Sequence, residues 1–237
     1  RQSDRPTPVP TPSGLVVKNG SNTRSRTSGG TPGPLSATVR TKPPSSVARA
    51  LIASSRKVAL KISRFDDVKS FAGMAAWLAP LFPGKDAAFL RHLEAACLLS
   101  DTGWFEHEDY QALHAFERIL LLPLYGIDHT GRAFLALANY VRYGGTGIED
   151  AARTARKILT EEGITLAIVA GLGMRVAYLL TGGALSLLKA SRLDMTEDQV
   201  VLHLGGAAAG LHAAVIDEAM KDLAEMLGRA CRVVAGA

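Results

Sequence analysis

Apolar residues recur every three or four positions along most of the chain after Val47, as they do on one face of an α-helix. Prolines and glycines interrupt this pattern and divide it into separate helices. The pattern predicts a bundle of helices over 86–99, 108–122, 130–143, 149–161 and 165–181. The inward face predicted for the second of these carries Tyr110, Leu113, Phe116 and Leu120. The inward face predicted for the third carries Phe134, Leu137, Ala138 and Val141.

The period of the pattern changes near the C-terminus. Residues 199–204 (QVVLHL) and 231–235 (CRVVA) are typical of short strands, and 207–227 between them keeps helical spacing. Two strands and a helix are too few to be stable alone, so this unit should pack on the bundle. We therefore predict a mainly α fold, with a helical bundle over 46–192 and a small α/β appendage over 193–237.

The first part of the chain differs from the rest in composition. The first 64 residues contain no aromatic side chain, and eight of the eleven prolines lie at or before Pro44. Such a segment buries too little apolar surface to offset the entropy of ordering it, so we predict that residues 1–45 form a disordered tail rich in Pro, Ser and Thr.

Charge follows the same division. Residues 1–57 carry ten Lys or Arg against Asp4 alone, whereas the remainder has 17 basic and 21 acidic residues. The high isoelectric point is therefore a property of the tail, and nucleic acid is not expected as a partner of the folded part. The tail could touch nucleic acid or polyphosphate, and a solvated arm with no partner is an equally open interpretation.

One apolar run, 164–188, has the ~20 residues that a membrane span requires. Arg175 lies at its middle, where a charge costs at least ~2.5 kcal/mol in a bilayer. We interpret the run as a buried helix followed by a Gly-rich turn, and expect no membrane partner. Two cysteines, Cys97 and Cys231, are too few for a disulfide framework, and no signal peptide opens the chain, so a reduced cytoplasmic protein is expected.

Residues that can carry chemistry gather between Arg91 and Gly145, which holds four of the six histidines. This segment contains 100–104 (SDTGW), followed by 126–129 (GIDH), 131–138 (GRAFLALA) and 140–143 (YVRY). The pattern resembles the C-terminal helical region of the Ppx/GppA family, the exopolyphosphatases and guanosine pentaphosphate phosphatases. The resemblance extends more loosely upstream to about Val47 and downstream to the C-terminus.

This region of the family is similar to the HD superfamily of metal-dependent phosphohydrolases, whose signature is an adjacent His-Asp pair on a helix. In this chain the pair position is Ser100-Asp101, and a hydroxyl is a poor ligand for a divalent transition metal. The remaining set of His92, Asp101 and His114 is incomplete, and the helical period places His92 and Asp101 ~180° apart around one helix. We therefore expect a degenerate HD-like bundle without a metal in this chain. Asp101 should accept hydrogen bonds or pair with an arginine.

Basic residues of the same segment offer a second kind of site. The planar fork of donors on arginine suits phosphate, and the resemblance implies that the intact enzyme threads polyphosphate past this region. We therefore expect a polyphosphate groove, with Arg118 and Arg132 best suited to phosphate and His114 as a further donor. Its predicted lining residues are Arg118, His129, Arg132, Arg142 and His107. The alternative is that these side chains form solvated faces and salt bridges within the bundle.

The sequence holds no G-x-S-x-G elbow, complete phosphate-binding loop or C-x-x-C pair. In the family that the resemblance indicates, an activated water releases the terminal phosphate of inorganic polyphosphate, and Gly-rich loops hold phosphate and magnesium. Those catalytic lobes should precede Val47 and are not recognisable there, as in a truncated or frame-shifted gene product.

We therefore expect this chain to serve polyphosphate binding and subunit contact, with a homodimer as the assembly that the family implies, and to be inactive alone. A stand-alone helical binding or interaction module is the alternative. A metal phosphohydrolase of HD type is a third hypothesis, which Ser100 weakens.

Two residues of the SDTGW motif carry predictions about folding. Gly103 lies where the predicted helix must stop, which favours a positive φ there. Trp104 is expected to be an anchor of the hydrophobic core.

Overall fold

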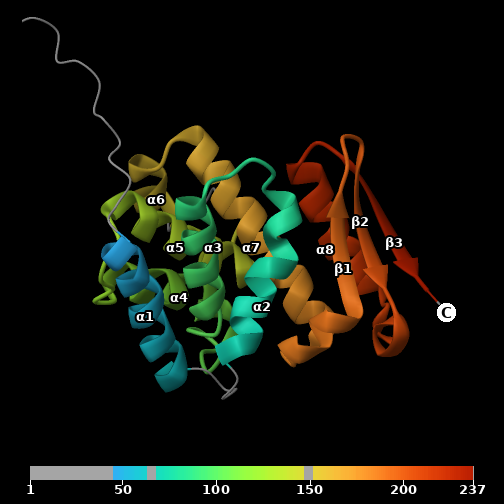
Figure 1. The fold of residues 1–237 in the computed structure, drawn as a ribbon, viewed down its shortest axis with the longest axis horizontal. Coiled ribbons are helices and arrows are strands. Elements are labelled where there is room, and N and C mark those ends of the chain that lie inside the picture. The colour runs from blue at the N-terminus through green and yellow to red at the C-terminus, as the bar shows by residue number, and fades with distance from the viewer. Residues whose placement is uncertain (1–44, 63–67, 147–151, 237) are drawn as a thin grey trace, which may run out of the picture. The chain divides into compact units, whose positions relative to one another are not determined.

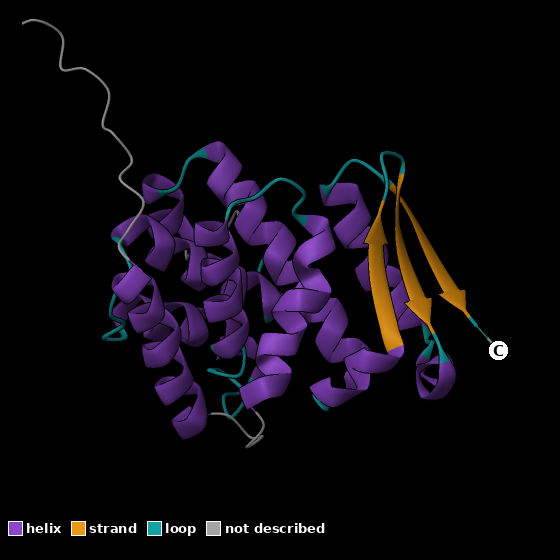
Figure 2. Ribbon diagram, viewed as in Figure 1, coloured by secondary structure: helices purple, strands orange, loops and turns teal. Residues whose placement is uncertain are grey.

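The computed structural model describes residues 45–62, 68–146 and 152–236. The tail predicted over 1–45 therefore lies outside the described residues except for its last one, as does the start of the helix predicted over 149–161. The fold is mainly helical with a small sheet near the C-terminus, which confirms the predicted fold class (Figures 1 and 2).

The α-helices are α1 (Ser45–Ile62), α2 (Val68–Leu78), α3 (Ala87–Leu98), α4 (Glu108–Leu121), α5 (His129–Arg142), α6 (Arg153–Ile158), α7 (Glu161–Thr181) and α8 (Ala214–Met226). Short 3-10 helices are η1 (Ala79–Leu81), η3 (Leu185–Ala190) and η4 (Gly206–Leu211). The strands are β1 (Ser191–Met195), β2 (Gln199–Leu204) and β3 (Ala230–Ala235).

Side-chain caps explain where three of the helices begin. The Asp86 carboxylate accepts a hydrogen bond from the Phe89 amide at 2.8 Å before α3, and Asp128 accepts one from the Gly131 amide at 2.6 Å before α5. The Thr160 hydroxyl does the same for α7. These short polar side chains satisfy amides that have no partner within their own helix, so the helix starts are encoded locally.

The core of the helical part is built around α5 and α7. Phe134, Leu137, Ala138 and Val141 are all buried, as predicted, and so is every other residue from Ala133 to Val141. Because α5 is covered by α3, α4, α6 and α7, this stretch of the helix has no solvated face. A methyl group built on Gly171 of α7 would lie 2.5 Å from the Ala138 carbonyl oxygen, so the two helices meet at backbone distance.

The sheet has the strand order β1-β2-β3. β1 pairs with β2 antiparallel, with Leu193 opposite Leu202, and β3 pairs with β2 in parallel. The parallel pair requires a crossover, which α8 provides while packing between α7 and the sheet (Figure 1). The strands predicted over 199–204 and 231–235 are confirmed, whereas the sequence pattern does not predict β1.

Helix α7 is long and apolar enough to span a membrane by length and composition, the single such helix among the described residues. Most of it is buried inside the protein, and it ends at Gly182 in the left-handed conformation. The apolar run is therefore a core helix followed by a glycine turn, as predicted.

Four local predictions are corrected by the structure. Trp104 is 40% exposed, because it follows the end of α3 in a surface turn, and the tryptophan of the core is Trp77. Gly103 does not have a positive φ; it lies in a tightly packed place instead, since a methyl group there would lie 3.1 Å from the Tyr143 ring. Tyr110 is exposed, because α4 turns Ala115, Phe116 and Ile119 inward.

The fourth correction concerns the segment before α7. The helix predicted over 149–161 ends at Ile158, and α7 already begins at Glu161. The capping hydroxyl of Thr160 sets this boundary, so the break falls earlier than the apolar spacing indicates.

Candidate functional site

Ser100 and Asp101 lie in the turn that follows α3, and both are buried. The Ser100 hydroxyl donates to the Cys97 carbonyl oxygen at 2.6 Å and lies 3.0 Å from the Tyr178 hydroxyl. Since the one Ser100 proton is used on the carbonyl, Tyr178 must be the donor in the second bond. Burial raises the pKa of Tyr178 above its ordinary value, so this phenol stays protonated. Ser100 is thus part of a hydrogen-bonded link between the turn after α3 and helix α7.

The two histidines considered as metal ligands beside Asp101 lie in different surroundings. His92 on α3 lies near Phe134 with ring centroids 6.5 Å apart, and burial lowers its pKa. His114 is held by Glu106, with Nδ1 3.0 Å from the carboxylate oxygen. Throughout the described ranges, no group of three His, Cys, Asp or Glu side chains is placed to hold a metal ion.

Arg118 and Arg132 use their donors within the fold. Arg118 pairs with Glu106 and lies over the Phe105 ring, 4.4 Å from its centroid. Arg132 donates to the carbonyl oxygens at the end of α4, those of Leu120, Leu122 and Leu124. Carbonyls at a helix end have no partner within the helix, so Arg132 acts as their cap. Both arginines therefore make contacts inside the helical bundle, as in the alternative interpretation of these residues.

Two of the histidines predicted for the groove, His107 and His129, lie at helix starts. His107 is the residue before α4, and its Nδ1 accepts from the Asp109 amide at 3.4 Å. His129 is the first residue of α5. Both are exposed to solvent.

Arg142 has a different environment from the other predicted groove residues. Its guanidinium is stacked between two aromatic rings, with its central carbon 3.7 Å from the Tyr178 centroid and 3.8 Å from the Tyr143 centroid. Tyr143 is itself fixed, since its hydroxyl accepts a hydrogen bond from the Gly103 amide at 2.9 Å. The two rings cover both faces of the guanidinium, and its buried Nε has no hydrogen-bond partner among the described residues.

Arg142 lines a cavity of about 270 Å³ together with Arg175 of α7. We call this cavity the arginine pocket; the rest of its lining comprises Gln111, Tyr143, Gly144, Tyr178, Leu179, Gly182 and Gly183. No carboxylate belongs to this lining. Among the described residues, neither arginine forms an ion pair or a hydrogen bond from its side chain.

The arginine pocket holds one of the five predicted groove residues, Arg142, and adds Arg175, which the sequence analysis did not assign to a site. The signal for Arg175 was present: it is a lone charge in an apolar helix, three residues before Tyr178 and hence on the same face. Because that helix also has the length and composition of a membrane span, the sequence alone shows the charge only as a cost of burial. What the sequence does not show is that α5 brings Arg142 to the same place.

Comparison with known protein families matches residues 60–234 to the family described as Exopolyphosphatase, C-terminal. The match covers well over half of the chain, from within α1 to the last strand. The chain belongs to this exopolyphosphatase C-terminal family. The family expected from the SDTGW, GIDH and YVRY motifs is thereby confirmed. No curated protein sequence matches the chain. The arginine pocket therefore lies in the C-terminal region of an exopolyphosphatase-type hydrolase.

Proposed function

We propose that this chain acts as the polyphosphate-binding C-terminal part of an exopolyphosphatase, and that it binds the substrate in the arginine pocket. The observation that carries the proposal is the pair Arg142 and Arg175, two cations with free donors in one cavity without a carboxylate. Two like charges held together are repulsive unless an anion joins them, so the arrangement favours a ligand with several negative charges.

The chemistry of the pocket suits a phosphate chain. An arginine presents two parallel donors to the oxygens of one phosphate, and neighbouring phosphates in a chain can meet neighbouring arginines. Gln111 adds a neutral amide donor, and Gly144, Gly182 and Gly183 leave parts of the wall without side chains. The exposed His107 and His129 remain proposed as outer contacts, whereas Arg118 and Arg132 would support the site only through the loop and helix end that they hold.

Binding of fluorescently labelled short-chain polyphosphate, followed by anisotropy, tests the proposal. Arg175→Gln and Arg142→Gln should each weaken binding about tenfold, the size of one lost charge-assisted hydrogen bond. The matched control is Arg232→Gln, which removes the same charge from an exposed position on β3. Equal loss in the control and the pocket variants would refute the arginine pocket as the binding site.

The basic tail needs a separate arm of the same experiment. Each phosphate neutralised by an exposed cation releases counterions, so binding by the tail should fall steeply with salt. A chain lacking residues 1–41 should keep the polyphosphate binding that depends on Arg175. It should lose the component of binding that falls steeply with salt. If truncation removes all binding and the arginine variants change nothing, the folded part has no polyphosphate site.

Catalysis by the isolated chain is not part of the proposal. The catalytic carboxylate, the Gly-rich loops and the magnesium implied for the family would belong to other lobes, in the cytoplasm. We expect the purified chain to release no phosphate from polyphosphate with magnesium or manganese. Release well above a blank without enzyme, abolished by Asp101→Asn, would overturn this and restore the hypothesis of an HD-type metal enzyme.

The alternative function is an interaction module, and one surface favours it. Trp104, Phe105 and Tyr110 are 40%, 53% and 55% exposed around the turn that leads into α4. Exposed aromatic side chains in one patch are typical of protein interfaces. Subunit contact, including a homodimer, is proposed for this patch. Sedimentation should detect the dimer in the parent chain and lose it with Phe105→Ser and Tyr110→Ser; identical sedimentation of both would exclude the patch.

A further inference from the structure

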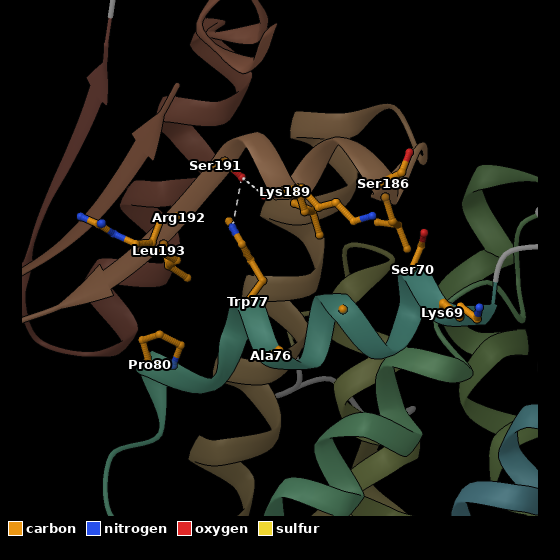
Figure 3. A pocket seen from close by; sticks show the side chains of 13 residues that line it. Lys69, Ser70, Ala76, Trp77, Pro80, Ser186, Lys189, Ser191, Arg192 and Leu193 are labelled. Atoms are coloured by element: carbon orange, nitrogen blue, oxygen red, sulfur yellow. Dashed lines mark hydrogen bonds between the residues drawn. The ribbon is translucent and has the colours of Figure 1, made fainter. Parts of the chain in front are cut away.

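A second cavity, of about 450 Å³, lies between α2 and the segment that runs from η3 into β1 (Figure 3). We call it the α2–β1 pocket, and it shares no lining residue with the arginine pocket. Its walls combine an apolar part, which includes Trp77, Pro80 and Leu193, with three cations, Lys69, Lys189 and Arg192. No Asp or Glu lines it. Its volume is within the range of cavities that hold small organic ligands.

Trp77 is fixed in place as a wall of this pocket. Its indole N–H donates to the Ser191 hydroxyl oxygen at 3.1 Å, and that hydroxyl donates to the Leu188 carbonyl oxygen at 3.0 Å. Figure 3 shows Trp77 rising from α2 toward Ser191 across the space between the two segments. The indole is thus held in one orientation before any ligand arrives, which reduces the entropic cost of binding.

One of the three cations of the pocket, Lys189, has no ionic partner among the described residues. Arg192 is satisfied, since its Nε lies 2.8 Å from the Asp194 carboxylate. Lys189, by contrast, forms no ion pair or hydrogen bond from its ammonium group among the described residues. Figure 3 shows its side chain lying along the pocket between Trp77 and Ser186. A lysine next to an apolar wall is a charge complement for an anion that also has an apolar body.

We propose that the α2–β1 pocket binds a small amphipathic organic anion. Its apolar body lies against Trp77, Pro80 and Leu193, and its anionic group meets Lys189. Inorganic phosphate or polyphosphate lacks the apolar body and is not a ligand here, so this site is independent of the proposed polyphosphate function. Ser186 also lines the cavity and offers a hydroxyl group as a further polar contact.

The test uses 8-anilinonaphthalene-1-sulfonate (ANS) and the full chain carrying Trp104→Phe. Because the chain has two tryptophans, this variant leaves Trp77 as the single one, and ANS bound beside it should quench its emission by energy transfer. The quenching should saturate with one ANS per chain. N-phenyl-1-naphthylamine, which has the same rings and no sulfonate, should bind about threefold more weakly if Lys189 contributes as a partly exposed ion pair does.

Two variants assign the binding to the pocket. Gly73 of α2 lines the cavity, and a Cβ added there meets no atom within 4 Å, so Gly73→Leu should direct its side chain into the cavity and abolish the quenching. Gly210→Leu is the matched control, because that glycine is equally open and lines none of the cavities described above. Lys189→Gln should remove the preference for the sulfonate, whereas Lys221→Gln should not.

Competition identifies the body of the ligand. Displacement of ANS by decanoate would indicate an aliphatic acid, and displacement by adenosine monophosphate would indicate an aromatic phosphate. Either result supports the proposal. Displacement by neither, unchanged quenching in Gly73→Leu, or equal affinity for the charged and uncharged naphthalenes would overturn it. Displacement by inorganic phosphate alone would also overturn it, because the apolar body would then be unnecessary.

Discussion

Replacing Gly171 by alanine should separate α5 from α7 and thereby disturb the arginine pocket. Gly171 faces α5, where the added methyl group would lie 2.5 Å from the Ala138 carbonyl oxygen and 2.6 Å from Cβ of Val141. Carbon and oxygen normally approach to about 3.3 Å in such contacts, so the helices must move apart by somewhat less than ~1 Å. The carbonyl belongs to helical backbone and cannot rotate away, so the strain is shared by both helices.

The magnitude follows from two opposing effects. Alanine is more favourable than glycine inside a helix by about 1 kcal/mol. Overpacking in a core costs about 1–3 kcal/mol, and a contact with rigid backbone belongs at the upper end of that range. The net loss should therefore be about 2 kcal/mol, which lowers the melting temperature of a domain of this size by about 4–8 °C.

Thermal unfolding followed by circular dichroism measures this loss, and Gly73→Ala supplies the control. Gly73 is also a helical glycine, but a methyl group there meets no atom within 4 Å, so the same change should raise stability by up to about 1 kcal/mol. Because Arg142 and Arg175 lie on the two separated helices, polyphosphate affinity should fall in the Gly171 variant alone. A Gly171→Ala protein that melts at or above the parent temperature would refute the close packing of α5 and α7.

Three further predictions concern single side chains. Trp77→Ala should cost about 3 kcal/mol or more of unfolding free energy because Trp77 is buried, whereas Trp104→Ala should cost less than about 1 kcal/mol; denaturant titration distinguishes them, and equal losses would contradict their placement. Burial lowers the pKa of His92 below its ordinary 6.5, so on acidification the unfolded chain takes up this proton before the folded chain does. The contribution of His92 to the free energy of unfolding is therefore fully present above pH 6.5 and is lost as the pH falls below it. His92→Gln should flatten the resulting decline in melting temperature, and an unchanged slope would exclude His92 as its source. Asp86→Ala removes the cap of α3 and should lower the free energy of unfolding by about 1 kcal/mol at neutral pH. Because the hydrogen bond from the Phe89 amide lowers the Asp86 pKa, the difference in stability between variant and parent should vanish in acid. A difference that does not change with pH would argue against the cap.

The helix boundaries near the site could be predicted from the sequence because their causes are local. Asp86 and Asp128 cap the helices that they precede, and Pro123 and Gly144 follow where helices end, all within a few residues of the backbone groups that they affect. The inward face of α5 was also predictable, since its apolar spacing is determined by the helical period alone. The family was recognisable for a related reason: its motifs are short and contiguous.

The arginine pocket and the corrected residues depend on contacts that are distant in sequence. Trp104 is as apolar as a core residue, but the turn after α3 leaves it exposed to solvent. Trp77 is buried because α2 packs against η3 and β1, which are distant in sequence. Strand β1 carries two charged residues in five, so its local propensity is weak; it forms because β2 supplies the hydrogen-bonding partner and buries Leu193.

The sequence by itself determined a mainly helical bundle, its family and the candidate segment of basic residues, since periodicity, caps and motifs act over a few positions. Only the tertiary structure decided which of those residues have free donors. Arg118 and Arg132 are used by neighbouring carboxylate and carbonyl groups, whereas Arg142 and Arg175 share a cavity without a carboxylate. The physical reason is that the state of a charged side chain depends on every group within a few ångströms of it, and α5 and α7 bring those groups together from 33 positions apart.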